Sequence, residues 1–345
     1  MTTIPKSYDQ AAARTAAWAC ALLEADGFRA CPPAVLAYYK APVGLLHTGH
    51  AGAAAQAMGI VERLFFRDGD FHAYQGDPTP RQGRSYRNGW LAWGAHLLGA
   101  YHLSEPALDR LEAGLDARTG GAADDDSAPV AERTYPAGGT ASVANALLAA
   151  GRTDAAIRAG GFLRELFDTQ AVDATRIFLA RDAQGAPIDP VQRGITSGAE
   201  SLVFDLSKPA QICWIFGFSL RVFARLYRAT QDRAWLVTAE RVGDWIAHAD
   251  ASLYTNITNG KVAWGAAELF GATGRCEWLD LAHRIGDWVA GEQGDDGVWV
   301  RRPQFASACE QPLAVSLDTS IERMFYMVDI QRAIALPHAR AGLTP

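Results

Sequence analysis

The most restrictive feature of this sequence is an internal repeat in its C-terminal half. Residues 229–245 and 272–288 share at least eight identical amino acids when they are aligned at one fixed offset. In both copies a short turn precedes a stripe of apolar residues at helical spacing, in which Trp235 corresponds to Trp278. Each copy therefore predicts a tight turn followed by an amphipathic helix.

A second kind of helix is expected before each of these turns. The segments 212–228 and 261–271 carry few charges, so each should be buried on all sides. The repeating unit is thus a buried inner helix, a tight turn and an amphipathic outer helix. Weaker copies are expected upstream, and the second of them should turn at residues 104–106. Their inner helices span 34–46, 86–102 and 139–150, and their outer helices span 51–66, 107–115 and 155–170.

An opening outer helix over 8–25 and a closing inner helix over 318–334 bring the expected total to twelve helices in six pairs. Six pairs close naturally into a ring, and we expect one all-α domain over residues 1–345. The connections from each outer helix to the next inner helix are long, and they should gather on one rim, where loops commonly carry function. These connections span 26–33, 67–85, 116–138, 171–211, 251–260 and 294–317.

Several short turns and one longer segment are similar to those of a known superfamily. They are Gly151-Arg152, Thr230-Gln231-Asp232, Thr273-Gly274-Arg275 and the segment Glu292–Trp299. Over nearly the whole chain the sequence resembles the six-hairpin (α/α)6-barrel proteins. That superfamily includes glycoside hydrolases, unsaturated uronyl hydrolases, sugar 2-epimerases, polysaccharide lyases and enzymes of the linalool dehydratase-isomerase type. The resemblance implies an (α/α)6 barrel. It says much less about the reaction, because members of this superfamily catalyse different reactions on the same fold.

The catalytic residues of these families do not transfer to this chain. Unsaturated uronyl hydrolases would be expected to carry aspartates at the second and third inner helices. Here those helices begin with Tyr86-Arg87-Asn88 and Gly138-Gly139-Thr140, and the arginine and histidine pattern of the sugar epimerases is not evident. Candidate residues must therefore come from the predicted geometry.

Composition and missing motifs exclude several classes of function. A formal net charge of −6 and the lack of any Lys or Arg run make nucleic acid an unexpected partner. No stretch has the length and apolar content of a membrane span or an export signal, so we expect a cytoplasmic protein. The five cysteines form no CxxC pair, and no zinc-protease, phosphate-loop, serine-hydrolase or dinucleotide motif occurs. We therefore expect no metal and no cofactor, and a small-molecule substrate.

Two acidic residues near the start of the last inner helix are the first catalytic candidates. Asp318 and Glu322 are four residues apart, which places them on one helical face beside Arg323. Two close carboxylates can divide into an acid and a base when their pKa values are pushed apart. The alternative is that Asp318 caps its helix while Glu322 forms an ion pair with a neighbour.

Polar residues before the fourth inner helix form a second candidate group. Asp205, Lys208, Gln211 and Trp214 are three residues apart, and they would align if the helix begins early. Asp205 is then a catalytic candidate, Lys208 and Gln211 bind substrate, and Trp214 offers a stacking surface. The alternative is a helix cap followed by a core tryptophan.

The second inner helix begins in an aromatic cluster. Tyr86 and the loop residue His72 are candidate proton donors or acceptors, because an imidazole titrates near neutrality and neighbours can tune a phenol. Trp90 is a candidate for substrate binding one turn further on. A loop histidine is, however, more often simply exposed.

Five further residues are candidates for substrate binding, and two of them also have a purely structural interpretation. Tyr39 interrupts the first inner helix, and Glu132 and Tyr135 precede the third. Asn259 and Lys261 stand at the fifth inner helix, where they can bind hydroxyls or a carboxylate. Burial with a satisfied hydroxyl is the alternative for Tyr39, and an ordinary turn is the alternative for Asn259.

Three functions remain open at this level. The first is an enzyme that acts on a carbohydrate or glycoside, as a hydrolase, lyase or epimerase, by acid–base chemistry without a cofactor. The second is a lyase, isomerase or cyclase of a terpenoid- or polyketide-like molecule, and the third is a non-catalytic binding ring. A polar pocket with convergent carboxylates and an exposed tryptophan face would favour the first, and an apolar closed cavity would favour the second.

Overall fold

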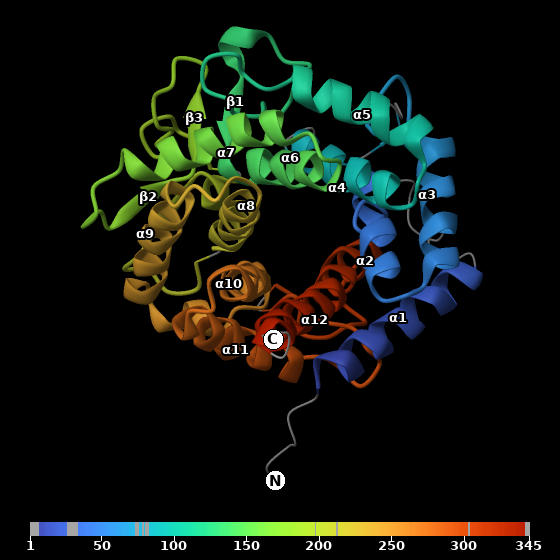
Figure 1. The fold of residues 1–345 in the computed structure, drawn as a ribbon. Coiled ribbons are helices and arrows are strands. Elements are labelled where there is room, and N and C mark those ends of the chain that lie inside the picture. The colour runs from blue at the N-terminus through green and yellow to red at the C-terminus, as the bar shows by residue number, and fades with distance from the viewer. Residues whose placement is uncertain are drawn as a thin grey trace.

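The structure is a computed structural model, and it describes residues 7–25, 34–72, 76–77, 79, 83–196, 198–211, 213–302 and 304–341, with side chains as far as residue 335. In this part of the chain, twelve α-helices close into a ring of six hairpins, an (α/α)6 barrel (Figure 1). The outer helices are α1 (Tyr8–Glu24), α3 (Ala51–Phe65), α5 (Tyr101–Ala113), α7 (Thr153–Asp168), α9 (Ala234–His248) and α11 (Cys276–Gly291). The inner helices are α2 (Ala41–His47), α4 (Arg84–Leu97), α6 (Ala137–Ala149), α8 (Trp214–Thr230), α10 (Gly260–Thr273) and α12 (Leu313–Ala341).

The inner helices approach one another closely where glycine replaces a side chain. A Cβ atom on Gly217 of α8 would collide with the backbone of Lys261 in α10. A Cβ atom on Gly265 of α10 would in turn collide with the backbone of Gly217. These two glycines therefore allow the two backbones to pack in direct contact, which holds Lys261 against α8.

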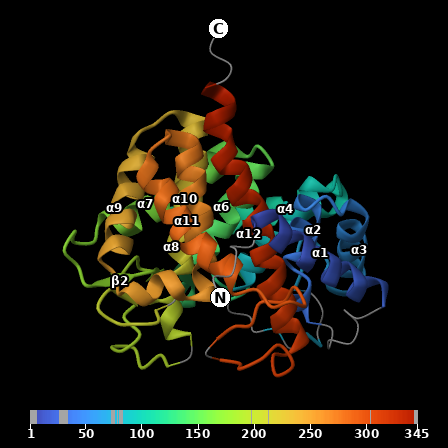
Figure 2. The same ribbon diagram turned by 90° about the horizontal axis from the view of Figure 1, so that it is seen from below.

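The two rims of the ring differ as the sequence predicts. Short turns at 48–50, 98–100, 150–152, 231–233 and 274–275 join the inner helices α2, α4, α6, α8 and α10 to the outer helices that follow them. The long connectors return to the opposite rim, and Figure 2 shows those before α8 and α12 at the bottom, away from the C-terminal end of α12. Because every inner helix begins at the connector rim, its first residues face the space that the connectors surround.

The second hairpin turns earlier than expected. The helix α4 ends before Gly99, which has the left-handed φ of 71° that glycine adopts without strain. The chain then enters α5 at Tyr101, and Pro106 lies inside that helix at the loss of one backbone hydrogen bond. The prediction of a turn at 104–106 is therefore wrong, because α5 continues through these residues.

Short strands tie two connectors together beside the ring. The strand β1 (Thr134–Pro136) pairs with β3 (Ala180–Asp182), which joins the connector before α6 to the connector before α8. The strand β2 (Arg176–Phe178) pairs with β4 (Val203–Asp205) within the latter. The described parts of the connectors also contain five 3-10 helices: η1 (Val35–Ala37), η2 (Val130–Glu132), η3 (Ala199–Ser201), η4 (Ala251–Thr255) and η5 (Ile257–Asn259).

Aromatic side chains from the inner helices fill the middle of the ring. The ring centroids of Trp90 and Phe218 lie 5.8 Å apart, and those of Trp264 and Phe325 lie 4.9 Å apart. All four side chains are buried. This aromatic plug makes the ring a packed core rather than a pore, and it separates the connector rim from the short-turn rim.

Candidate active site

A cavity of about 330 Å³ lies at the connector rim, where the inner helices begin. Residues from α4, α8, α10 and α12 and from several connectors meet in it. We call it the polar chamber, because most of its side chains are charged or hydroxylated. Its lining consists of Tyr39, Lys40, Tyr86, Glu200, Ser201, Trp214, Thr258, Lys261, Arg301, Gln304, Asp318, Glu322 and Arg323.

Asp318 is held in the chamber by two cations and a phenol. One carboxylate oxygen lies 2.7 Å from Nζ of Lys40 and accepts a 2.5 Å hydrogen bond from the hydroxyl of Tyr39. The other lies 2.8 Å from Nη2 of Arg301. Burial raises the pKa of Asp318, but the charges of Lys40 and Arg301 outweigh it and hold this pKa below its ordinary value.

Glu322 lies one helical turn further along α12 and shares Lys40 with Asp318. Its Oε1 is 2.7 Å from Nζ of Lys40 and also contacts Nζ of Lys261, while its Oε2 lies 2.8 Å from Arg323. Burial raises the pKa of Glu322, but Lys261, Lys40 and Arg323 together lower it well below the ordinary value. Both carboxylates are therefore ionised near neutral pH.

Lys261 is the group of the chamber that changes its charge near neutrality. Its side chain is buried, and Nζ lies 4.7 Å from the centre of the Trp214 ring. Burial and the nearby charge of Lys40 lower the pKa of Lys261, Glu322 opposes them, and the result is a pKa of about 7. A lysine with this pKa can both take up and release a proton under ordinary conditions.

The two tyrosines of the chamber keep their protons. Burial, followed by the negative charges of Asp318 and Glu322, raises the pKa of Tyr39 and of Tyr86 well above the ordinary value. The hydroxyl of Tyr86 lies 3.4 Å from Glu322. Both phenols therefore act as hydrogen-bond donors toward the carboxylates or toward a ligand that replaces them.

Six residues that the sequence predicts for the site line this one chamber. They share a position at or near the N-terminal end of an inner helix, which is the geometry expected from the ring. They are Tyr39, Tyr86, Trp214, Lys261, Asp318 and Glu322.

The expected alignment of Asp205, Lys208 and Gln211 with Trp214 is wrong. The helix α8 begins only at Trp214, and Asp205 lies in the strand β4, so the four residues share no helical face. The Asp205 carboxylate accepts a 2.7 Å hydrogen bond from Ser207 and lies 3.4 Å from Lys208. Gln211 accepts a hydrogen bond from the Asp205 backbone amide, and none of the three side chains lines the chamber.

His72 also lies outside the chamber. Its Nε2 accepts a 3.2 Å hydrogen bond from Nε of Arg87, which requires a neutral ring. Burial and the charge of Arg87 lower the pKa of His72 to about 3. The structure therefore contradicts the expectation that this imidazole titrates near neutrality.

The remaining predicted residues do not line the chamber. Glu132 is exposed in η2, and the Tyr135 hydroxyl donates to Asp116 at 3.4 Å. Trp90 belongs to the aromatic plug beneath the chamber. Asn259 is buried, accepts a 2.9 Å hydrogen bond from the Cys213 amide and donates to a backbone carbonyl in η4, so it fixes the starts of α8 and α10.

Sequence reasoning underrated the cations of the chamber. Lys40 and Arg301 were not predicted as site residues, and Lys261 was expected only as a ligand for hydroxyls or a carboxylate. A usable signal existed, because Lys261 and Glu268 are the two charged residues of the inner segment 261–271. A charge in such a helix must find a partner or a cavity, since its burial alone is costly.

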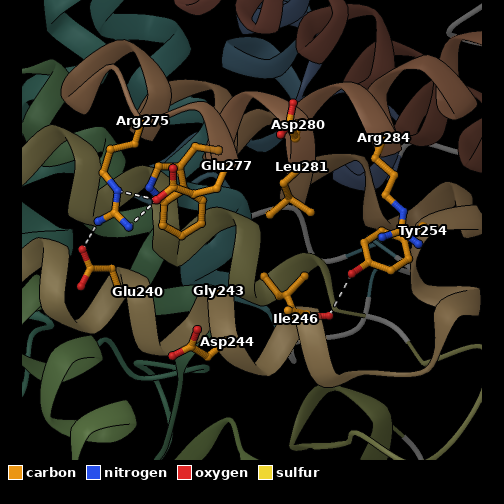
Figure 3. Close-up of a pocket in the computed structure, with 12 residues that line it drawn as sticks. Glu240, Gly243, Asp244, Ile246, Tyr254, Arg275, Glu277, Asp280, Leu281 and Arg284 are labelled. Atoms are coloured by element: carbon orange, nitrogen blue, oxygen red, sulfur yellow. Dashed lines mark hydrogen bonds and ion pairs between the residues drawn. The ribbon is translucent and has the colours of Figure 1, made fainter.

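A groove on the outside of the ring contrasts with the chamber. It lies between α9 and α11 and has a volume of about 360 Å³ (Figure 3). Its charges face solvent: Arg275 pairs with Glu240 and Glu277, and all three side chains are more than 40% exposed. Exposed pairs of this kind are screened by water. Hydrogen bonds, rather than burial, are the main cause of the raised pKa of Arg275 and the lowered pKa of Glu277.

Two further properties concern the described residues only. Within them, no group of three or more histidine, cysteine or acidic side chains is arranged to hold a metal ion. None of the helices in the described ranges combines the length and the apolar content needed to cross a membrane.

Comparison with known proteins identifies relatives by fold alone. No protein-family model matches the sequence, and no curated protein matches it. Among solved structures, a GH76 α-mannanase from Bacteroides thetaiotaomicron is 15% identical with a TM-score of 0.58, covering 89% of this chain and 85% of its own. A D-mannose isomerase is 11% identical with a TM-score of 0.63 and coverages of 85% and 86%. An unsaturated glucuronyl hydrolase specific for heparin is 10% identical with a TM-score of 0.57 and coverages of 87% and 86%. These similarities confirm the predicted (α/α)6 barrel.

Proposed function

We propose that this protein is an enzyme that acts on a carbohydrate-like, polyhydroxylated small molecule in the polar chamber by proton transfer. The observation that carries the proposal is the buried network in which Lys40 joins Asp318 to Glu322 and Lys261 contacts Glu322. Such a concentration of buried, shifted groups around a cavity is typical of catalytic sites. The solved structures of similar fold include a mannanase and a mannose isomerase, which favours a sugar as substrate.

The chamber supplies both kinds of contact that a sugar requires. Charged and hydroxyl groups such as Lys40, Tyr39 and Arg301 can bind hydroxyls. The face of Trp214 offers an apolar surface against which the carbon skeleton can lie. A terpenoid or polyketide substrate would gain little in this chamber, because its charged groups would lose their solvation without replacement.

The protonation states favour proton abstraction over glycoside hydrolysis. A hydrolase needs a carboxyl group that is still protonated near neutral pH, whereas the pKa values of Asp318 and Glu322 are lowered. Neutral Lys261 can instead remove a proton from a carbon next to a carbonyl group and return it to the same or the adjacent carbon. Hydrogen bonds from Tyr39 or Arg301 would stabilise the oxyanion that forms on the carbonyl oxygen. This sequence is an isomerisation or epimerisation, and a lyase reaction follows if a leaving group departs instead.

Deuterium exchange tests this function directly. The protein is incubated in D₂O with D-mannose, D-glucose, D-fructose and D-glucuronate, and proton NMR follows the hydrogen next to the carbonyl group. We expect exchange or isomerisation with at least one of these sugars. Lys261→Met should reduce the rate by roughly 10²- to 10⁴-fold, the usual contribution of a general acid–base group. Lys208→Met is the matched control, because Lys208 is two-thirds exposed and lies outside the chamber.

Three other outcomes would contradict the proposal in different ways. Release of nitrophenol from 4-nitrophenyl α-D-mannopyranoside without any exchange would indicate hydrolysis and remove the role of Lys261. An undiminished exchange rate in Lys261→Met would also show that Lys261 is not the group that transfers the proton. Binding of these sugars without turnover would indicate the non-catalytic ring instead.

A further inference from the structure

A second cavity of about 470 Å³ adjoins the polar chamber. The two share Tyr86, Ser201 and Trp214, so these residues form a common wall. The rings of Tyr86 and Trp214 lie 5.3 Å apart within that wall. We call the second cavity the apolar annexe, after the side chains that dominate the rest of its lining: Pro136, Ile188, Ile195, Leu202 and Ile215.

The charged side chains of the annexe already have partners in the protein. Arg87 donates from Nε to His72. One carboxylate oxygen of Asp124 accepts a 2.7 Å hydrogen bond from the backbone amide of Gly83. Burial raises the pKa of Asp124 above its ordinary value. A ligand in the annexe therefore meets mainly aliphatic surface and the tryptophan ring.

Glycine keeps the annexe open beside the tryptophan. Gly138, in the first turn of α6, faces the edge of the Trp214 ring, and a Cβ atom there would lie 2.6 Å from it. Any larger residue would push the ring aside, because such an approach is closer than van der Waals contact allows. The first turn of α6 thus preserves both the ring position and the space beside it.

We propose that the substrate is amphiphilic: a polyhydroxylated head occupies the polar chamber while an alkyl or aryl substituent on it occupies the apolar annexe. The inference rests on the proposed function for the head group and adds the substituent. Each cavity suits a different chemistry, and their common wall lets one molecule extend into both. Burial of methylene groups against the isoleucines and Leu202 would increase affinity in proportion to the apolar area removed from water.

Calorimetric binding of three probe types tests this assignment without requiring turnover. Methyl glycosides of D-mannose and D-glucose present only the head, n-hexanol presents only the chain, and the corresponding hexyl glycosides present both. We expect a hexyl glycoside to bind at least tenfold more tightly than its methyl counterpart and than hexanol.

A bulky side chain in the annexe should remove this advantage selectively. Ile195→Trp fills the annexe from the connector before α8, where Ile195 is only partly buried. It should lower hexyl glycoside affinity to that of the methyl glycoside and leave methyl glycoside affinity unchanged. The matched control is Val191→Trp on the same connector, because Val191 is 80% exposed and lines neither cavity.

The alternative results separate the two proposals. Equal affinity for hexyl and methyl glycosides overturns the amphiphilic assignment and leaves the proposed function standing. Equal affinity for hexyl glycosides and hexanol, or no binding of any glycoside, overturns the amphiphilic assignment because the head group then contributes nothing, and deuterium exchange with the free sugars tests the proposed function separately. A preference for hexyl glycosides that survives Ile195→Trp overturns the placement of the chain in the annexe.

Discussion

The inner helices carry buried charges at both ends of the ring, and the two groups differ in what surrounds them. At the connector rim, Lys40, Lys261, Asp318 and Glu322 line the polar chamber. Below the aromatic plug, toward the short-turn rim, the guanidinium of Arg221 in α8 contacts the rings of Trp93 and Trp264, 4.9 and 4.3 Å from their centres. The first group faces a cavity and the second is enclosed by packed side chains.

The enclosed group is held by fixed partners. Arg221 donates to Asn145 and lies 3.4 Å from Glu268, which also pairs with Arg228 at 2.7 Å. Burial lowers the pKa of Arg221 to about 9 despite these partners. Asp329 accepts from His47 and from the Trp264 indole at 3.0 Å each. These charges connect α2, α6, α8, α10 and α12, so they set the helix positions.

The difference teaches that burial of charge alone does not mark a functional site. Both groups are buried and both contain shifted pKa values. What distinguishes the chamber is a cavity that lets a ligand replace the protein contacts of Lys261 and of the two carboxylates. Substitutions in the enclosed group should therefore affect stability, and substitutions in the chamber should affect chemistry.

The largest expected effect on stability is that of Arg221→Met. It removes both cation–π contacts and leaves Asn145 and Glu268 without this partner in the core. We expect the free energy of unfolding to fall by about 3–5 kcal/mol, the usual cost of removing one member of a buried pair. Urea unfolding measures the change, and a loss below about 1 kcal/mol would contradict a structural role for Arg221.

Lys261→Met should behave in the opposite way. Glu322 keeps Lys40 and Arg323, so its charge remains paired, and the free energy of unfolding at pH 7 should change by no more than about 1 kcal/mol. A loss as large as that of Arg221→Met would show that the two groups have the same role and would break the comparison.

The pH dependence of the same variant sharpens the test. The pKa of Lys261 falls from 10.5 to about 7 in the folded protein, so between these values the unfolded chain binds more protons than the folded one. The free energy of unfolding of the wild type, relative to Lys261→Met, should therefore rise as the pH increases from about 7 to 10.5. Urea unfolding of both proteins across this range measures the difference, and a constant difference would contradict the lowered pKa.

These two groups also show which features of the protein can be predicted from its sequence. The repeat over 229–288 predicts the ring, because a periodic pattern of turns and apolar stripes is a local property. The spacing of Asp318 and Glu322 likewise predicts their common face, which the chamber confirms. Lys261 as a proton carrier was not predictable in this way, since its pKa depends on burial against α8 and on Lys40, more than two hundred residues away.

Errors in the predicted site have the same origin. The three-residue spacing predicts Asp205 and Gln211 on the same helix as Trp214. The start of α8 depends instead on a tertiary contact, because the helix begins where Asn259 accepts a hydrogen bond from the Cys213 amide. His72 looked like a free imidazole because nothing in the sequence indicates that Arg87 covers it. Local patterns thus predict faces and lengths of helices, whereas the tertiary contacts decide which polar groups reach the cavity.

Arg332→Ala should have the smallest effect and marks the outer limit of the enclosed group. Arg332 is 60% exposed, lies 4.0 Å from Asp329 and donates a 2.8 Å hydrogen bond to the His47 carbonyl. Water can replace these contacts, and Asp329 keeps His47 and Trp264, so the free energy of unfolding should change by less than about 0.5 kcal/mol. Urea unfolding beside Arg221→Met measures it. A loss approaching that of Arg221→Met would mean that the structural charges extend to the surface, and that access to solvent does not separate the two ends of the ring.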